Sequence, residues 1–557
     1  MKPILKHNRG FKWFESDGVY FKGYFFDEKG RLYKNEEACQ FFKYVSYCSV
    51  RREIEGLNGS FAVVVNREGI KFAATDRLRS IPLFYTNTEE ELFVSDDAET
   101  LLEVSRLSIV IDPVSVDEFL LSGFVIGSKT LIKKLLQVRA GEILMQQQDN
   151  SHKVIQYYRH LSDIEPIESK DKEFDKLDLI TEGWCDRLIR SVDDRQIVIP
   201  LSGGYDSRYI AAELVKRNKG NEIISYTYGT VSSPEVIRSK KVAEALGIRW
   251  YFVEYSSQKY QSFLCSNKHD EYISFSHQCS STPHYQEYLA LDELTRTGII
   301  KKGAVVIPGF CGDFLGGSYV PLEVKDHKDN LLIAKGIVNH IIAKQLYQKI
   351  FLQDKVSSDI KSHIESEIKY IGGSVAPKTV QELVSINDSF FAQHKVAKYV
   401  VNSLRVYEFF DLQWRMPLWD NKLHEYWYSI PYCLRGKNCL YNEYLVRRVF
   451  IPSGINFTRP PGGGGAKLEK ALLSNSCISK HSEKLLLVAH RVNAVFRKED
   501  PTAFDIPKEI YRSQIEENFK KRLPETKTFP AIFSRWILFK LYGLRSSCVA
   551  VGKKKIN

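Results

Sequence analysis

The residues most suited to chemistry follow one another in a single short segment, Ser202-Gly203-Gly204-Tyr205-Asp206-Ser207. Glycines allow a backbone to approach a phosphate group closely. A carboxylate beside them can hold Mg²⁺ against the same phosphates, and the hydroxyls of Ser202 and Ser207 can donate hydrogen bonds. The segment therefore predicts a loop that handles the phosphates of ATP, with Asp206 as a magnesium ligand.

The sequence on either side of this segment predicts the elements that would position it. The apolar run 197–201 is typical of a buried strand, and 207–217 has helical periodicity, with apolar residues on one face at Ile210, Ala211, Leu214 and Val215. The start of a helix offers free N–H groups and a partial positive charge to an anion. Ser-Gly-Gly alone also fits an ordinary capping turn, but the strand–loop–helix context favours phosphate binding. The alternative phosphate loop, G-x-x-x-x-G-K-[ST], does not occur in the sequence.

Length and composition indicate a globular protein of two or more domains. The chain has 557 residues, of which 43% are hydrophobic and 26% charged. The net charge of +11 permits an anionic substrate or a nucleic acid. Spread over so long a chain, it is more typical of a solvated basic surface.

Cysteine usage and the termini bear on localisation. The ten cysteines are scattered and form no C-x-x-C pair, which argues against a zinc site and suits a reducing compartment. Residues 1–7 have no apolar signal-peptide core, and no run of about 18 apolar residues occurs. We therefore expect a cytoplasmic protein with no membrane partner. The apolar stretch 529–544 is interrupted by Arg535 and Lys540, which predicts a packed C-terminal helix.

Residues 1 to about 160 have the pattern of a β-rich region. Strand-like segments separated by glycine and asparagine turns occur at 19–26, 60–65, 70–74, 83–85 and 142–145. The charged segment 165–176 is interpreted as a linker.

From about Asp178 the pattern changes to alternating helices and strands. Helices are expected at 179–192 and 234–246, and strands at 197–201, 223–228, 250–253 and 304–307. Such alternation predicts a parallel sheet with right-handed crossovers, which binds ligands at the carboxyl ends of its strands. Residues from about 320 to 557 are mostly helical by periodicity.

Several further segments carry a family resemblance. They are Gly56-Leu57-Asn58-Gly59-Ser60-Phe61-Ala62, Ala74-Thr75-Asp76-Arg77, Pro82-Leu83-Phe84-Tyr85, Thr130-Leu131 through Ala140-Gly141, Gly309-Phe310-Cys311-Gly312-Asp313 leading to Gly316-Gly317, and Arg415-Met416-Pro417-Leu418-Trp419-Asp420. With the loop at 202–207, their order resembles the asparagine synthetase family from about residue 17 to about residue 450. Each motif is individually weak, and the set is specific through its order and spacing.

The resemblance implies an α/β fold of two domains. Residues 1–165 would form a glutamine amidotransferase-like domain, a β-rich sandwich of the Ntn-hydrolase type. Residues 178–557 would form an ATP-pyrophosphatase domain with a parallel sheet, similar to the adenine nucleotide α-hydrolases, and a helical C-terminal region.

The resemblance also implies the site residues. ATP would be bound by Leu201, Ser202, Gly203, Gly204, Asp206, Ser207, Tyr228, Gly229 and Gly309. Asp206 and Asp313 would share Mg²⁺ and, with Arg447, act in catalysis. Two simpler interpretations stay open: a turn-capping role for Asp313, and an ordinary strand end at Tyr228-Gly229, which by resemblance lines the adenine pocket.

The chemistry implied is amide formation driven by ATP. A substrate carboxylate attacks the α-phosphate, pyrophosphate leaves, and an amine then displaces AMP from the acyl-adenylate. The expected partners are a small-molecule carboxylate and an amine or ammonia. No nucleic acid is expected, and a homodimer is compatible with the sequence.

The first domain departs from the family pattern. Glutamine-using members have a catalytic cysteine directly after the initiator Met, whose own α-amine acts as base. Here position 2 is Lys2, Cys39 and Cys48 are internal, and the N-G-E-I-Y-N glutamine-binding stretch has no clear counterpart. We expect no ammonia release from glutamine and a structural role for this domain, as in the related β-lactam synthetases.

The second domain departs at three charged positions. Phe310 and Gln413 stand where the family usually has Glu, and Glu443 replaces the lysine of an E-K-Y-L-L-R segment. Loss of one stabilising charge of this kind costs about 3 kcal/mol of barrier. Arg447, Lys437 or Lys467 could substitute. The glycine-rich run 459–467 could act as a lid over the nucleotide, although a flexible surface loop is the favoured interpretation.

The sequence is compatible with three functions. The first is an AMP-forming, ATP-dependent amide ligase with an unidentified carboxylate acceptor. The second is a nucleotide-binding homologue without turnover, suggested by the three departures. The third is an RNA-modifying enzyme of the same superfamily, supported only by net charge. His284 could face an acceptor pocket, but a packed or surface histidine is favoured.

Overall fold

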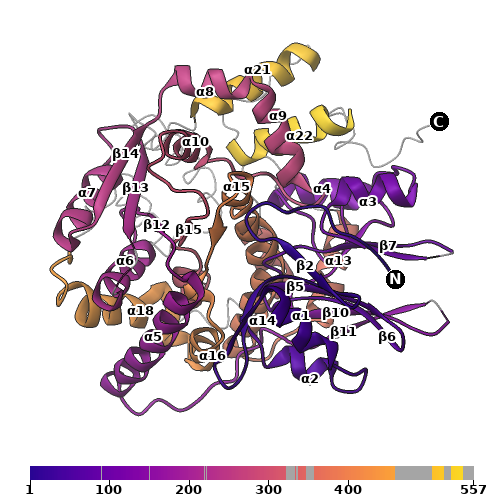
Figure 1. Cartoon of the computed structure of the whole chain (residues 1–557), viewed down its shortest axis with the longest axis horizontal. Coiled ribbons are helices and arrows are strands. Elements are labelled where there is room, and N and C mark those ends of the chain that lie inside the picture. The colour runs from indigo at the N-terminus through magenta and orange to yellow at the C-terminus, as the bar shows by residue number, and fades with distance from the viewer. Residues whose placement is uncertain are drawn as a thin grey trace.

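The computed structural model describes residues 1–89, 91–149, 151–218, 220, 222–321, 333, 336–345, 357–457, 505–519 and 529–543. Two β-sheets form its N-terminal part, and a third, parallel sheet forms the core of the part that follows (Figure 1). Helices α14 (Val380–Phe391) and α15 (Arg405–Phe409) lie between the two parts in Figure 1.

Two sheets face each other in the N-terminal part. The larger has the order β11-β10-β6-β5-β3-β2 with β4 beside β3, and its neighbouring strands are antiparallel. The smaller has the order β1-β8-β7-β9, in which β1 and β8 are parallel. The strands are β1 Lys2–Ile4, β2 Trp13–Ser16, β3 Val19–Phe26, β4 Leu32–Lys34, β5 Asn58–Arg67, β6 Ile70–Thr75, β7 Phe84–Asn87, β8 Leu92–Ser95, β9 Leu136–Gln137, β10 Glu142–Gln146 and β11 His152–Gln156.

Strand β5 shows how the sandwich is held together. Successive side chains of a strand point to opposite faces of the sheet. Phe61 and Val63 join a core with α1 (Asn35–Lys43) and α2 (Val50–Glu55), whereas Val64 on the other face joins the core shared with the smaller sheet. Because both faces are covered, the strand is an almost continuous apolar run. The β-rich sandwich predicted for this region is confirmed.

The third sheet is parallel throughout, as predicted. Its order is β14-β13-β12-β15-β16, and each neighbouring pair is parallel. The strands are β12 Ile197–Pro200, β13 Ile223–Gly229, β14 Arg249–Glu254, β15 Val305–Val306 and β16 Gln413–Trp414. The strand expected at 304–307 is shorter, and β16 was not predicted because it is only two residues long.

The remaining elements are helical. They are α3 Ala98–Ser105, α4 Pro113–Ser122, α5 Lys170–Val192, α6 Tyr205–Arg217, α7 Pro234–Leu246, α8 Ser257–Leu264, α9 Asn267–His277, α10 Tyr288–Arg296, η1 Phe314–Ser318, α12 Ile337–Gln345, α13 Ser358–Tyr370, η3 Ala392–Val400, η4 Pro417–Trp419, α16 Asn421–Ser429, α17 Tyr432–Arg435, η5 Gly436–Asn438, α18 Cys439–Tyr444, η6 Leu445–Phe450, α21 Asp505–Phe519 and α22 Phe529–Tyr542. The described residues beyond 336 thus fit the predicted helical C-terminal region.

The predicted linker at 165–176 is partly wrong, because α5 already begins at Lys170. Ser169 caps this helix by accepting a hydrogen bond from the Lys172 amide at 3.3 Å. Phe174 is buried, while the charged residues that suggested a linker lie mostly on the exposed face. A run of charged residues therefore does not distinguish a linker from the exposed face of an amphipathic helix.

The last described helix, α22, packs against the protein. Ile532, Phe533 and Ile537 are buried, and α22 lies beside α21 and α4. The packed C-terminal helix predicted here is confirmed. Among the described residues, no helix combines the length and the apolar character needed to cross a membrane.

Candidate active site

The phosphate loop predicted from sequence connects β12 to α6. Two serine hydroxyls shape it: the Ser202 amide donates to Ser207 Oγ at 3.1 Å, and the Gly204 amide donates to Ser202 Oγ at 3.1 Å. Leu201 is anchored to β13, because its amide donates to the Tyr226 carbonyl at 2.9 Å. The loop is thus pre-shaped by its own side chains.

Two arginines hold the carbonyl of Gly203. Arg238 Nη1 donates to it at 3.0 Å and Arg208 Nη2 at 3.3 Å. A Cβ at Gly203 would lie 2.5 Å from Arg238 Nη1, so a side chain does not fit there without displacing the guanidinium. The N-cap of α6 is Gly204, which has no side chain to cap the helix. The amides of the first turn are thus not capped by the residue that precedes it, as an anion-binding helix start requires.

The two acidic residues predicted to share a metal lie together. The Asp313 amide donates to Asp206 Oδ2 at 3.0 Å. Burial, and then the nearby Asp313 carboxylate, raise the pKa of Asp206. The pKa of Asp313 is also raised, chiefly because protein atoms surround it, although its side chain is accessible to solvent. Two such carboxylates repel each other and favour a cation between them.

The backbone between Gly309 and Asp313 makes this approach possible. Cys311 is buried and has a φ of +75°, a left-handed conformation that is uncommon for a residue with a side chain. A Cβ at Gly312 would lie 2.8 Å from Asp206 Cγ, and a Cβ at Gly309 would lie 2.6 Å from the Ser207 amide nitrogen. The two glycines therefore let the loop after β15 lie directly against the start of α6.

Tyr441 of α18 completes this arrangement, and the sequence analysis missed it. Its hydroxyl donates to Asp206 Oδ1 at 2.8 Å, so both carboxylate oxygens of Asp206 are held. A helical pattern at 439–450 could have found it. Tyr441 and Tyr444 are three residues apart and buried, whereas Glu443 and Arg447 are four apart on a more exposed face.

Lys395 of η3 is a second residue that the sequence analysis missed. Its ammonium lies 4.9 Å from the centre of the Tyr319 ring and lowers the pKa of Asp313 through its charge. No motif surrounds Lys395, so only the fold reveals it. It supplies positive charge close to the acidic pair.

The donor set fits Mg²⁺. This ion is usually held by one or two carboxylates, with substrate phosphates and water completing its octahedron. Asp206 and Asp313 provide two carboxylates beside a helix start that is suited to phosphate. The described residues contain no group of three or more acidic, histidine or cysteine side chains able to hold a metal without such a substrate.

The ion pairs of Arg447 and Glu443 are with each other and, for Glu443, with Lys170, not with the acidic pair. Arg447 is 59% exposed and pairs with Glu443 at 3.0 Å, and Glu443 also pairs with Lys170 at 2.7 Å. The catalytic role predicted for Arg447 stays a prediction. Lys437 lies in η5 with a φ of +57°, and Lys467, with the run 459–467, lies outside the described residues.

The residues predicted for the adenine end and the acceptor pocket are packed. The Tyr228 ring stacks on Tyr255 with their centres 5.0 Å apart, at the end of β13. Gly229 has a φ of +128°, which favours glycine. Burial lowers the pKa of His284 to about 4, and its ring packs edge-on against Tyr399 at 6.4 Å. The favoured interpretation of His284 as a packed side chain agrees with this environment.

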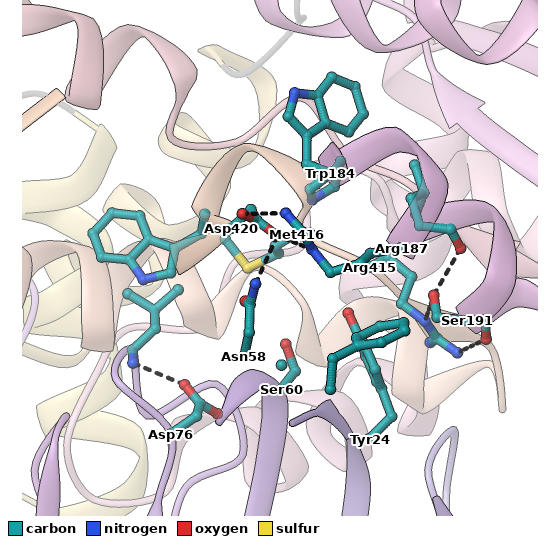
Figure 2. A pocket seen from close by; sticks show the side chains of 16 residues that line it. Tyr24, Asn58, Ser60, Asp76, Trp184, Arg187, Ser191, Arg415, Met416 and Asp420 are labelled. Carbon is teal, nitrogen blue, oxygen red and sulfur yellow. Dashed lines mark hydrogen bonds and ion pairs between the residues drawn. The ribbon is translucent and has the colours of Figure 1, made fainter. Parts of the chain in front are cut away.

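The Arg415 to Asp420 segment serves the contact between the two parts of the chain. A cavity of about 40 Å³ lies there, and Figure 2 shows side chains from both parts of the chain lining it. Asp420 accepts two hydrogen bonds from Arg187, at 2.7 and 2.8 Å, and one from Asn58 at 2.9 Å. Arg415 donates to Ser191 Oγ at 2.9 Å. These charged side chains are therefore engaged in structural contacts.

Gln413, one of the predicted departures, has a structural role in the same region. Its side-chain oxygen accepts hydrogen bonds from Arg195 at 2.5 Å and from Arg415 at 3.2 Å. Phe310 is partly buried and packs against the main apolar core. Neither residue offers a carboxylate to the acidic pair.

The N-terminal part presents no activated thiol near its first residue. The amine of Met1 donates to the side chain of Gln146, and Lys2 forms an ion pair with Glu91 at 3.7 Å. Burial raises the pKa of the Cys39 thiol to about 11, so it stays protonated at neutral pH. The absence of glutamine hydrolysis stays a prediction.

Two family models match the chain. A glutamine amidotransferase domain matches residues 46–158, and an asparagine synthase domain matches residues 187–452. The chain has the two-domain architecture of the asparagine synthetase family. The match supports an ATP-using carbon–nitrogen ligase of the amidotransferase type as the class of activity. The predicted domains, 1–165 and 178–557, enclose these two matches, and their exact bounds stay a prediction.

Similarity to individual proteins is weak. A search of the curated proteins finds no match. The U34-tRNA thiolase NcsA from Methanococcus maripaludis has 17% identity and a TM-score of 0.20, covering 42% of this chain and 79% of its own. Glutamine-dependent NAD⁺ synthetase from Acinetobacter baumannii, in complex with ADP, has 11% identity and a TM-score of 0.17, covering 58% of this chain and 67% of its own. TM-scores this low support no inference about activity.

Proposed function

We propose that this member of the asparagine synthetase family is an AMP-forming amide ligase that adenylates a carboxylate with Mg-ATP and transfers ammonia or another amine to it. The observation that carries the proposal is the position of Asp206 and Asp313. Both lie at the carboxyl edge of the parallel sheet, one in the first turn of α6 and the other after β15, with the Asp313 amide 3.0 Å from Asp206 Oδ2.

The loop and helix start would bind the triphosphate. The amides in the first turn of α6 would face phosphate oxygens, and Ser202 and Ser207 would keep the loop in shape through their mutual hydrogen bond of 3.1 Å. Asp206 and Asp313 would hold Mg²⁺ against those oxygens, which would supply the charge neutralisation that phosphoryl chemistry needs. Leu201, Tyr228, Gly229 and Gly309 would contact the nucleotide around this centre.

The reaction would proceed in two displacements. A carboxylate oxygen of the acceptor bonds to the α-phosphorus, and the bond to the β-phosphate oxygen breaks to release pyrophosphate. The amine then bonds to the acyl carbon, the bond to AMP breaks, and the nitrogen loses a proton. Lys395 would offset negative charge near Asp313 during the first displacement, in place of the family lysine that Glu443 replaces.

The amine would come from solution or from a partner. Position 2 is Lys2, and the buried thiol of Cys39 stays protonated. We therefore propose that the N-terminal domain is structural, that the protein acts in the cytoplasm on small molecules without nucleic acid, and that a homodimer is compatible with these features.

A pyrophosphate-release assay with Mg-ATP and a panel of carboxylic acids tests the proposal, with ammonia or a second amine present. We expect release with at least one acid and a drop of about 100-fold or more for Asp206→Ala. Asp186→Asn changes an exposed carboxylate of α5 and serves as the matched control. Release no faster than that of Asp206→Ala for every acid would refute the proposal.

A nucleotide-binding homologue without turnover is the second candidate. Gln413 and Glu443 favour it, because both are engaged in contacts outside the acidic pair. Calorimetry that shows ATP binding, together with no AMP under any acceptor, would support this candidate. Formation of AMP would exclude it.

A further inference from the structure

A second cavity, of about 20 Å³, lies between the N-terminal and synthetase parts of the chain, away from the acidic pair. Among the residues that line it, Arg79 comes from the first part and Ser281, Lys398 and Arg405 come from the second. All four are more than nine-tenths buried. This volume suits one or two water-sized groups and no larger ligand.

Arg79 is a buried cation that forms no direct ion pair among the described residues; the nearby Asp76 acts on it only through its charge. Its Nε donates to the Val138 carbonyl at 3.1 Å and its Nη1 to the Ala397 carbonyl at 3.4 Å. Its Nη2 has no hydrogen-bond partner, and no carboxylate among the described residues lies within ion-pair distance. A buried charge in this situation is costly unless something pairs with it.

Lys398 is a second buried basic side chain of this cavity. It is 2% exposed, and its Nζ donates to the carbonyls of Val125, at 2.6 Å, and Gly127. Burial, and then the charges of Arg79 and Arg139, lower the pKa of Lys398 well below its usual value, although Glu367 and Glu118 oppose the shift. In the part of the chain that the structure describes, no carboxylate forms an ion pair with Lys398.

Two further side chains of the cavity, Arg405 and Ser281, also have a donor without a hydrogen-bond partner. Arg405 pairs with Glu408 at 2.6 Å, yet its Nε has no hydrogen-bond partner. The Ser281 hydroxyl also has none. Three buried groups that line one small cavity therefore have unused donors: Arg79 Nη2, Arg405 Nε and Ser281 Oγ.

The acidic groups of the cavity wall are already engaged. Asp96 accepts hydrogen bonds from Trp13 Nε1 at 2.7 Å and from the amides of Lys6 and His7, and it lies 3.6 Å from Lys22 Nζ. His7 pairs with Asp97 at 2.7 Å. The wall thus has an excess of positive charge. Burial, and then the charge of Arg405, lower the pKa of Arg79 to about 9, although the charge of Asp76 opposes the shift.

From these contacts we infer that the cavity binds a small monovalent anion, a halide or a single carboxylate group, which accepts hydrogen bonds from Arg79, Arg405 and Ser281 and thereby bridges the two parts of the chain. A water molecule would satisfy the donors but leave the charge uncompensated. An apolar ligand would leave both unsatisfied. The inference is independent of the reaction proposed above.

Anomalous diffraction from crystals soaked in bromide tests the site directly. We expect a bromide peak within hydrogen-bond distance of Arg79 Nη2 and Ser281 Oγ. In solution, the full-length protein in gluconate, an anion too large for the cavity, should gain thermal stability saturably when chloride or formate replaces it at constant ionic strength. A response to chloride alone identifies a halide site, and a response to formate alone identifies a carboxylate site.

Two variants keep the test sharp. Arg79→Met should abolish the saturable response, and Ser281→Ala, which removes one donor and is expected to fold, should raise the half-saturating anion concentration about tenfold. Ser122→Ala is the matched control, because Ser122 is buried, donates to the carbonyls of Glu118 and Phe124 at the end of α4, and is not part of the cavity. Absence of bromide at this position, or a Ser281→Ala response equal to that of the unmodified protein, would overturn the inference.

Discussion

The Tyr441 hydroxyl donates a hydrogen bond to Asp206 at 2.8 Å, across 235 residues of sequence. This contact joins α18 to the first turn of α6 and leaves Asp206 little freedom, because the Asp313 amide holds its other oxygen. A carboxylate held at both oxygens is pre-positioned for a metal and for phosphate chemistry. Tyr441 is therefore a positioning residue for the proposed reaction.

Tyr441→Phe should lower the rate of pyrophosphate release by about 10-fold or more, because a hydrogen bond to a charged group contributes about 1.5–3 kcal/mol. The half-saturating Mg²⁺ concentration should rise in the same titration. Tyr444→Phe is the matched control, since its hydroxyl contacts Thr181 and Asp178 instead. Equal loss of activity in both variants would show that Tyr441 acts only through the stability of α18.

Gly312→Ala should disable the site without unfolding the protein. A Cβ there would lie 2.4 Å from Tyr441 Oη and 2.8 Å from Asp206 Cγ, so the two would have to separate. We expect pyrophosphate release to fall at least 10-fold while the unfolding midpoint in urea changes little. Gly183→Ala, in the middle of α5 with space around it, should stay active and gain up to about 1 kcal/mol of stability. Full activity of Gly312→Ala would contradict the assigned geometry.

Lys395→Met tests whether this lysine supplies the charge missing at Glu443. The charge of its ammonium lowers the pKa of Asp313, and the ammonium lies over the Tyr319 ring. Loss of one preorganised charge costs about 3 kcal/mol of barrier, so kcat for AMP formation should fall about 100-fold with a smaller change in KM for ATP. Lys268→Met, at an exposed lysine of α9 that pairs with Asp292, is the control. An unchanged kcat in Lys395→Met would remove this lysine from the reaction.

Sequence reasoning located those parts of the site that depend on local pattern. Strand β12, the loop and α6 are contiguous, so apolar periodicity and glycine chemistry specify them together. Asp313 was implied by the family resemblance of the segment 309–317, which follows another strand of the sheet. Parallel strands bring their carboxyl ends to one edge, which is why the two aspartates meet.

The rest of the site depends on packing between distant helices, which no local pattern encodes. Tyr441 reaches Asp206 from a helix whose motif drew attention to Glu443 instead. Lys395 lies in a π-helical segment without any recognisable motif. The Arg415–Asp420 segment was recognised only as a family resemblance, and the fold places its charged ends at the contact between the two parts.

Arg187→Met should destabilise that contact. Arg187 donates two hydrogen bonds to Asp420, whose side chain is only 7% exposed, and Asn58 from the N-terminal part donates a third (Figure 2). Removing one partner of a buried pair leaves a charge uncompensated, which costs about 3 kcal/mol. Urea unfolding measures this loss. The exposed Arg52, 3.2 Å from its neighbour Glu53, gives the control Arg52→Met, expected to change stability by less than about 1 kcal/mol. An equal loss of stability in the two variants would contradict a buried, stabilising ion pair between Arg187 and Asp420.

Glu287 should make the stability of the protein fall as the pH rises from about 4.5 to about 7. Burial raises its pKa from 4.5 to about 7, although hydrogen bonds from Tyr226 and Tyr407 oppose the shift. Because the folded state binds this proton more tightly than the unfolded state, the stabilisation is complete below pH 4.5. It is lost as the pH rises through the folded pKa, by about 3 kcal/mol in total. Urea unfolding at pH 5 and pH 8 should show a smaller difference for Glu287→Gln than for the exposed control Glu244→Gln. An equal difference in the two variants would show that Glu287 is already ionised in the folded protein.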